Sequence, residues 1–285
     1  MTRTDPHVRS CRGVRIAAVI ALVLSWSPGA ALAQWIRYPT PDVPRTVDGQ
    51  PDLKAPPPRL PDGKPDFSGI WGTAVKTPCV DSPTRPVDCG IELPMSPLGV
   101  SIGLGMPGGL PYQRWAAALT KQRTADGNKD DPHAHCLPDN PPRPYGLPHL
   151  MKIVHMPRLL IMLFEFNVMY RQIFIDGRPL PQDPNPSWNG YSSAVWEGDT
   201  LVVRTNGFRD DLWLDVSGSP MTEVARMTER IRRPTYGSLE VEIMVDDPKA
   251  YTGPWTVSMN QEIRLDVELI DDFCIENEKA SQRMR

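Results

Sequence analysis

Hydrophobic and polar residues alternate with a period of two through much of the second half of the chain. Between residues 238 and 246, for example, Leu239 and Val241 share one parity while Glu240 and Glu242 share the other. This alternation gives a strand one buried and one solvated face, which is typical of antiparallel sheet. Alternation and apolar runs together predict strands at 67–75, 159–166, 168–175, 191–197, 200–206, 222–233, 236–246 and 261–270.

About eight strands with one solvated face must bury their other face and protect their edges. Turn signals such as Asp176-Gly177 and Gly198-Asp199 join neighbouring segments closely, as in hairpins. We therefore expect a mainly β fold, namely an antiparallel up-and-down barrel. A β-sandwich is the alternative.

Proline content divides the chain near residue 158. Residues 34–158 contain 23 prolines and residues 159–285 contain 8, and because proline cannot donate to a strand ladder, the first part cannot be mostly sheet. We expect a Pro-rich extended arm at 34–66 and a single barrel domain at 67–285 with an insertion at about 77–150. Within the insertion, the stretch GLPYQRWAAALTKQ (109–122) is predicted to form a helix.

The arm contains a short repeat, VDGQPDL at 47–53 and PDGKPDF at 61–67. Asp-Gly followed by proline favours a turn. We interpret the arm as a segment that lies along the surface of the barrel. The alternative is an arm that docks a partner.

The first 33 residues are typical of an export signal. Four arginines precede the apolar run IAAVIALVL, which is too short to span a bilayer, and Ala31-Leu32-Ala33 fits the cleavage pattern before Gln34. We expect cleavage near Ala33 and a periplasmic or secreted protein without membrane insertion. The remaining 27 basic and 33 acidic side chains give a net charge of −6, which argues against nucleic acid as a partner.

Four cysteines remain after this cleavage, and in an oxidising compartment an even number indicates disulfides. Of the three pairings we favour Cys79–Cys89, which closes a short loop, together with Cys136–Cys274, which ties the end of the chain to a histidine-rich stretch. Loop-entropy arguments give these bonds about 3 and roughly 5 kcal/mol. No C-x-x-C is present, so a thiolate zinc site is not expected.

The stretch DPHAHCLPDNPPRPYGLPHLMKIVHMP holds four of the five histidines. In an extended chain His133 and His135 would point to one side and form a partial metal site. A polar loop tied by Cys136 is the alternative, because two imidazoles are fewer than the ligands that a tight site needs. His149 and His155 would lie about 20 Å apart in an extended strand, so they cannot share one ion.

Acid–base candidates lie where the alternation predicts buried faces. His155 shares the parity of Ile153, and a buried neutral imidazole can act as an acid or base near neutral pH, although a core histidine is the alternative. Glu229 lies on the apolar face of its strand, so either an interior arginine neutralises it or its pKa is raised for catalysis. Glu165 ends a strand that is apolar on both faces, and its direction is undetermined.

The loop NGFRDDLWLDVSGSP (206–220) is predicted to form a rim above the barrel. Asp211 and Asp215 flank Trp213 there, as general bases in a lid or as solvated side chains around a residue that caps the core. For the binding of a small apolar or aromatic molecule, the candidate residues are Tyr170, Arg171, Trp188, Tyr191 and Trp213.

Gly69-Ile70-Trp71 resembles the Gly-x-Trp signature of lipocalin-like (calycin-type) barrels. The resemblance implies that Trp71 closes one end of the barrel and that a late arginine, Arg230 or Arg264, stacks on it. The segments PDFSGIWG, YRQIFIDGRPLP, WEGDTLVVRTNGF, TERIRR and DDPKAYTGPWTV together resemble a broad group of uncharacterised secreted bacterial proteins. This resemblance covers most of the chain after the signal and implies no activity.

A barrel of about eight strands can hold one small ligand. We therefore expect an exported protein that binds a small, fairly apolar molecule in the mouth of the barrel. One alternative is an acid–base enzyme (lyase, isomerase or hydrolase) on the same scaffold, and another is a metal-binding protein that uses His133 and His135. No G-x-S-x-G, phosphate loop or H-E-x-x-H occurs, and no cofactor is expected.

Overall fold

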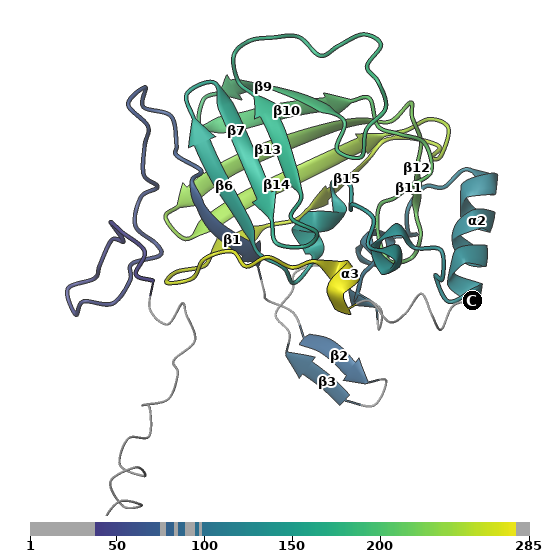
Figure 1. Ribbon diagram of the computed structural model, residues 1–285, viewed down its shortest axis with the longest axis horizontal. Coiled ribbons are helices and arrows are strands. Elements are labelled where there is room, and N and C mark those ends of the chain that lie inside the picture. Colours follow the sequence, from purple (N-terminus) through teal and green to yellow (C-terminus); the bar gives the residue numbers. More distant parts are fainter. Residues whose placement is uncertain (1–37, 75–77, 83–84, 89–94, 97–98, 278–285) are drawn as a thin grey trace, which may run out of the picture. The chain divides into compact units, whose positions relative to one another are not determined.

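The structure is a closed barrel of nine strands, shown in Figure 1. This computed structural model describes residues 38–74, 78–82, 85–88, 95–96 and 99–277, so the predicted signal segment lies outside it. Neighbour by neighbour, the ring consists of β13 (Arg226–Thr235), β10 (Thr200–Asn206), β9 (Tyr191–Glu197), β8 (Tyr170–Phe174), β7 (Leu159–Phe164), β6 (Met151–Met156), β1 (Gly69–Thr73), β16 (Gln261–Ile263) and β14 (Ser238–Asp246). Pairing of β13 with β14 closes the ring, and the predicted barrel is thereby confirmed.

One pairing in the ring is parallel, whereas an antiparallel barrel was expected. Strands β8 and β9 pair in parallel through Ile173↔Ser192 and Phe174↔Ser193, and the chain crosses over between them. The sequence pattern could not predict this, because side chains alternate with a period of two in both kinds of sheet. Only two residue pairs join β8 and β9.

Several predicted elements have different bounds in the structure, and two of them differ in an informative way. The strand expected at 261–270 ends at Ile263, because Asp266 has a φ of 57°, which a strand does not allow. An additional strand, β15 (Trp255–Ser258), precedes β16 in the chain. Both pair with β14, β15 at residues 242–245 and β16 at residues 238 and 239. The insertion helix, expected at 109–122, is α2 (Arg114–Ala125); Pro111 lies before its start, and the Pro111 oxygen accepts the backbone N–H of Thr252.

The remaining described elements are short and lie mainly in the insertion and the late loops. They are β2 (Pro78–Ser82), β3 (Arg85–Asp88), β4 (Met95–Ser96), β5 (Gly99–Val100), η1 (Ile102–Gly105), η2 (Pro132–His135), η3 (Arg143–Gly146), β11 (Leu212–Trp213), β12 (Pro220–Met221) and α3 (Cys274–Asn277). No helix in the described part of the chain is long and apolar enough to cross a membrane.

The barrel interior is filled by the alternate residues that the sequence pattern assigns to it. Burial of each such large apolar side chain stabilises the fold by about 1.5–3 kcal/mol. Side chains in this core with no exposed surface are Leu160, Met162, Ile173, Leu201, Val203, Ile231, Leu239, Val241, Ile243 and Val245. The interior is therefore mainly a packed core.

Trp71 closes one end of the barrel, and Arg233 is the arginine that stacks on it. The guanidinium of Arg233 lies 4.9 Å from the Trp71 ring centroid and donates to the backbone oxygens of Tyr236 and Asp66. The expectation of Arg230 or Arg264 was wrong: Arg230 pairs with Glu197 on the surface, and Arg264 donates to the backbone of β1. Arg233 shares the parity of Glu229 and Ile231, so the ordinary alternation of β13 directs its side chain into the barrel.

Tyr145 closes the other end from the insertion. Its helix, η3, is wholly buried, and its hydroxyl donates to the Glu229 carboxylate inside the barrel at 2.8 Å. The backbone oxygen of Tyr145 accepts from Thr73 of β1 and Gln261 of β16. We call this end of the barrel, where η3 is inserted, the plugged end.

Candidate functional site

Glu229 lies at the centre of the barrel and is neutralised by an arginine. Both Arg171 Nη atoms donate to its two carboxylate oxygens, one of them at 2.9 Å, and neither side chain is exposed. Arg171 also donates to Ser192 and Thr205. Burial disfavours the charge of Arg171, but the charge and hydrogen bonds of Glu229, together with those of Tyr145, outweigh this effect and raise the pKa of Arg171. The contacts favour a structural ion pair over a free catalytic acid.

His155 points into the barrel at the end closed by Trp71, as its parity predicts. Its Nδ1 accepts the backbone N–H of Phe67 at 3.2 Å and lies 3.6 Å from an Asp66 carboxylate oxygen, which is too long for a hydrogen bond. The ring stacks on both Phe67 and Trp196, which also contact each other. These contacts favour a core histidine that joins the arm to β6.

Glu165, Asp211 and Asp215 contact neither the Glu229–Arg171 pair nor His155. Glu165 accepts backbone N–H groups of Leu150 and Ile270, and Asp211 is exposed with its oxygen 3.6 Å from Arg209. Asp215 is buried and accepts three backbone N–H groups, from residues 102, 217 and 219. Burial raises the pKa of Asp215 against the effect of these donors. The predicted acid–base residues therefore do not share one site.

Most of the predicted ligand-binding residues share a pocket outside the barrel wall. Tyr170, Arg171, Trp188 and Tyr191 line a volume of about 510 Å³ between β8 and β9, which we call the wall pocket. Trp213 instead lines a pocket of about 550 Å³ next to α2, to which Trp188 and Asp211 also contribute. Of the five predicted ligand-binding residues, only Arg171 reaches the barrel interior, where it donates to Glu229, Ser192 and Thr205.

The predicted metal pair His133 and His135 is separated by the local backbone. Residues 132–135 form the 3₁₀-helix η2 and not an extended strand, so side chains two positions apart point in different directions. His135 Nε2 lies 2.7 Å from the backbone oxygen of Lys129, and Cys136 is bonded to Cys274. In the part of the chain that the structure describes, no group of three or more potential metal ligands occurs.

A different arrangement surrounds His133 at the plugged end. His133 and His149 line a pocket of about 450 Å³, which we call the histidine pocket. Both rings contact Phe166: His133 stacks on it at 4.2 Å between centroids, and His149 is tilted at 5.2 Å. The rest of the lining is Val100, Gly127, Asn128, Asp131, Ala134, Arg143, Gly146, Leu147, Pro148, Leu214, Asp215 and Val216.

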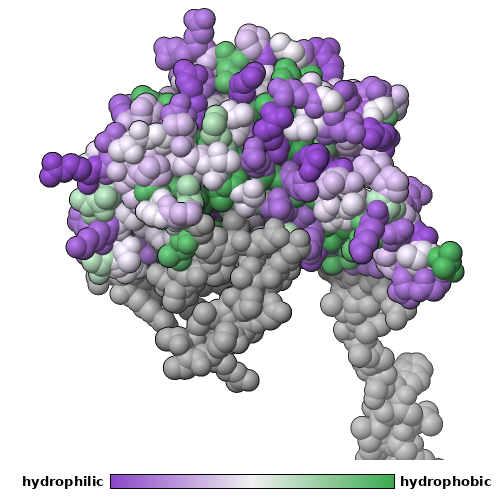
Figure 2. Space-filling view, turned by 180° about the vertical axis from the view of Figure 1, so that it is seen from behind, coloured by the Kyte–Doolittle hydropathy of each residue, from purple (hydrophilic) through white to green (hydrophobic). Residues whose placement is uncertain are grey.

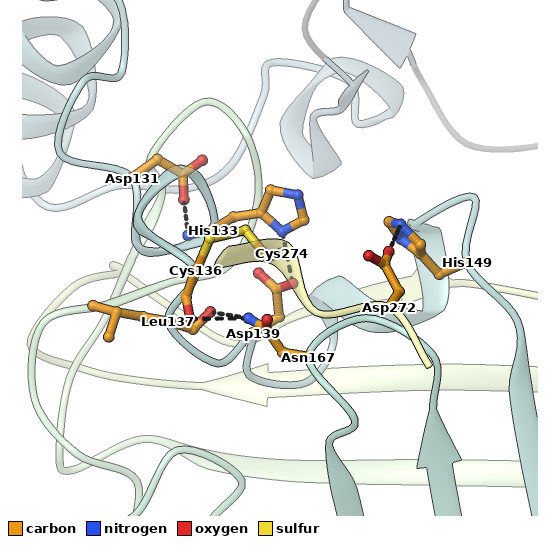
Figure 3. The surroundings of a disulfide bond; sticks show 9 residues. All are labelled: Asp131, His133, Cys136, Leu137, Asp139, His149, Asn167, Asp272 and Cys274. Carbon is orange, nitrogen blue, oxygen red and sulfur yellow. Dashed lines mark hydrogen bonds and ion pairs between the residues drawn. A yellow bond between two sulfur atoms is a disulfide. The ribbon is translucent and has the colours of Figure 1, made fainter. Parts of the chain in front are cut away.

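Each of the two imidazoles is held by a carboxylate, as Figure 3 shows. His133 Nδ1 lies 2.8 Å from an oxygen of the buried Asp139, and His149 Nε2 lies 3.2 Å from an oxygen of Asp272. Because a carboxylate only accepts, Nδ1 of His133 carries the proton in this pair. The other nitrogen of His133, Nε2, makes no hydrogen bond within the described residues and is turned away from Asp139.

Arg143 organises the carboxylates beneath His133. It is buried and donates to both oxygens of Asp131 at 2.7 and 2.8 Å. Its Nε also lies 3.2 Å from Asp139, an ion pair without hydrogen-bond alignment. Burial disfavours its charge, but the hydrogen bonds of Asp131 and the charge of Asp139 raise the pKa of Arg143. Asp131 also caps η2 by accepting the N–H of His133 at 3.0 Å.

The predicted disulfide Cys136–Cys274 is present and fixes both halves of the site. Cys136 ends η2, which carries His133, and Cys274 follows Asp272 by two residues (Figure 3). Asn167 reinforces this junction, since its side chain donates to Cys136 O and its backbone N–H donates to Asp272 O. The predicted Cys79–Cys89 bond stays a prediction, because Cys89 lies outside the described residues.

The histidine pocket combines an apolar wall with oriented polar groups. Leu147, Pro148 and Leu214 supply apolar surface, while His133 offers Nε2 as an acceptor or, when protonated, as a donor. A pocket of this kind can bind a small, mainly apolar molecule, and an imidazole oriented by a carboxylate can also move a proton. On the face shown in Figure 2, hydrophobic residues form small separate groups among hydrophilic ones.

Sequence reasoning missed Asp139, Arg143 and Asp272 in this site. Asp139 and Arg143 come from one segment and Asp272 from another that only the fold brings beside it, and none lies in a periodic stretch. The one signal available was a buried-charge pattern in DPHAHCLPDNPPRPYG, where acidic residues and one arginine occur among prolines.

No protein-family model, curated protein or solved structure matches this chain. Its resemblance to a group of secreted bacterial proteins therefore stays a prediction. The barrel itself is compatible with a lipocalin-like fold, including the tryptophan that closes one end.

Proposed function

We propose that this protein binds a small, mainly apolar molecule with one polar group in the histidine pocket at the plugged end of the barrel. The observation that carries the proposal is the pairing of an apolar wall with His133, whose ring is fixed by Asp139 and whose Nε2 bonds to none of the residues that the structure describes. The volume of about 450 Å³ is within the usual range for small-molecule sites. The packed barrel interior favours this place over the barrel mouth that the sequence suggested.

We further propose that the protein acts outside the cytoplasm, after cleavage near Ala33. The Cys136–Cys274 bond supports this, because structural disulfides persist in oxidising compartments. A binding protein at this location would meet its ligand before the ligand enters the cell.

The binding proposal is tested with a library of small aromatic and aliphatic compounds that each carry one hydroxyl or carboxylate group. The readout is the set of imidazole nitrogen resonances of His133 and His149, observed by NMR in the disulfide-bonded protein. We expect at least one compound to shift both imidazoles saturably. We also expect Ala134→Trp, which fills the pocket from η2, to abolish those shifts, while Ala134→Ser keeps them.

Tyr191→Ala in the wall pocket serves as the matched control and should leave the binding unchanged. Binding that survives Ala134→Trp and disappears with Tyr191→Ala would place the ligand site in the wall pocket and contradict the proposal. Native mass spectrometry of protein taken from its own host adds a direct measurement of any retained ligand.

An acid–base enzyme is the second candidate function, favoured specifically by the His133–Asp139 pair. In this role Nε2 would take a proton from the bound molecule, and Asp139 would stabilise the imidazolium that forms. Asp139→Asn would then slow turnover of a substrate and shift its pH profile without abolishing binding. If the bound compounds come back chemically unchanged after long incubation, the enzyme candidate is wrong while the binding proposal stands.

A further inference from the structure

The repeat in the arm forms two copies of the same turn. RTVDGQPD at 45–52 and RLPDGKPD at 59–66 are offset by 14 residues, so each residue of one turn has a counterpart in the other. We call them the first turn and the second turn. Gly49 and Gly63 sit at equivalent positions and have φ values of 81° and 82°, a conformation that glycine adopts without strain.

Most hydrogen bonds of the two turns correspond. Arg45 Nη1 donates to Gly49 O at 2.8 Å, and Arg59 Nη1 donates to Gly63 O at 2.7 Å. Backbone bonds match in the same way, for example Asp52 N to Pro44 O and Asp66 N to Pro58 O, both at 2.8 Å. In each turn the glycine carbonyl therefore holds one end of an arginine guanidinium.

The second turn binds the β9–β10 hairpin, whose connection is Gly198-Asp199. Arg59 donates to both carboxylate oxygens of Asp199, at 3.0 and 2.7 Å, and Lys64 Nζ donates to the Gly198 oxygen at 3.0 Å. The second turn thus recognises a Gly-Asp hairpin turn through a bidentate arginine–carboxylate ion pair and a hydrogen bond from a lysine to a backbone carbonyl.

The first turn presents the same groups without such a target. Within the described residues, Arg45 makes no hydrogen bond or ion pair apart from the bond to Gly49, and the residues around it are exposed. Val47 at the tip is fully exposed. Gln50 replaces Lys64, and its amide N–H₂ can also donate to a carbonyl oxygen. The contacts at the base of the first turn, from Leu53 O and Ala55 O to the β13–β14 connection, leave the tip free.

We propose that the first turn is a docking site for a partner protein that exposes a β-hairpin with a Gly-Asp turn. Arg45 pairs with the aspartate as Arg59 pairs with Asp199, and Gln50 donates to the glycine carbonyl. The partner must supply its own hairpin, because the Gly198-Asp199 turn of this chain is already bound by the second turn. This interaction is independent of the histidine pocket.

The probe for this proposal is a cyclised hairpin peptide with the sequence SAVWEGDTLVVR, residues 193–204 of this chain. Cyclisation is needed because an isolated hairpin is marginally stable. The peptide is titrated into the full protein, and the Arg45 side-chain N–H and the Gly49 and Gln50 amides are followed by NMR. Because the contact is small, we expect saturation at roughly millimolar peptide.

Shifts confined to the first turn support the proposal, and both Arg45→Gln and a peptide with asparagine for its aspartate should remove them. Arg232→Gln, an exposed arginine lost from the barrel surface, is the control with the same change of charge and should bind as the wild type does. An absence of saturable shifts, an equal response to the asparagine peptide, or unchanged binding by the Arg45→Gln protein with an otherwise native spectrum overturns the proposal.

Discussion

At the scale of single residues, the molecule contains charged groups whose burial is tolerated only because each has a fixed partner. Arg171 and Glu229 neutralise each other in the core, and Arg143 with Asp131 does the same beside the histidine pocket. Removing one member of such a pair leaves an unpaired buried charge, which costs far more than the pair itself contributes.

Glu229→Gln should therefore lower the free energy of unfolding by about 3–5 kcal/mol. The neutral amide leaves the Arg171 charge without its counter-charge in the core. Chemical denaturation at neutral pH measures the change, and Arg232→Gln, which breaks an exposed pair with Glu240, should cost less than about 1 kcal/mol. A stability gain in Glu229→Gln would contradict the structural assignment and indicate a strained functional acid.

Asp66 should make stability depend on acidic pH. Burial acts to raise its pKa, but the nearby His155 side chain and the hydrogen bonds from Ser68, including its backbone N–H at 2.8 Å, lower it to about 2. As the pH falls, Asp66 therefore becomes protonated in the unfolded chain before it does so in the folded protein. The stabilisation that its low pKa gives above pH 3.8 is lost as the pH falls toward 2. Denaturation midpoints between pH 7 and pH 2 should show that the advantage of wild type over Asp66→Asn shrinks across this range. A constant difference would contradict the prediction.

At the scale of elements, short segments from distant parts of the chain are fastened to the barrel by a few strong contacts. The η2 and α3 segments meet through the Cys136–Cys274 bond, which joins residues 138 positions apart. The η3 segment is held by Tyr145 inside the barrel. The histidine pocket exists because these fastenings place short, irregular segments beside a rigid barrel end.

Replacing both Cys136 and Cys274 by serine should lower stability by about 2–4 kcal/mol, because the unfolded chain regains the freedom that the long loop restricts. The pairing of His149 with Asp272 should loosen as well, since Asp272 lies two residues from Cys274. Denaturation measures the first effect, and the imidazole resonance of His149 reports the second. Unchanged resonances of His149 would show that the bond does not position Asp272.

At the scale of the whole molecule, a closed ring leaves no unprotected edge among its nine strands. Closure depends on β1 and β16, which come from opposite ends of the described chain and pair at Trp71↔Ile263. Hydrogen-exchange mass spectrometry should therefore find amides of β1 and β16 protected to a degree similar to those of β13 and β14. Exchange in β1 and β16 faster by several orders of magnitude would show that the barrel opens at this seam.

The sequence by itself determined the class of fold and most of its strands, because period-two alternation states directly which face of each strand is buried. It also predicted that His155 faces inward, that Glu229 needs an explanation, and that the arm repeats a turn, while the place of Trp71 followed from the resemblance to the Gly-x-Trp signature. These are local properties, carried by residues close together in the chain.

Only the tertiary structure decided the parallel pairing of β8 with β9, the partnership of Arg233 with Trp71, and the assembly of His133, Asp139, Arg143 and Asp272 around one pocket. The sequence favoured the Cys136–Cys274 pairing but could not show which side chains the bond brings together. The physical reason is that contact between distant segments depends on how the barrel closes and which irregular loops cover its ends. Neither leaves a periodic signal in the amino-acid sequence.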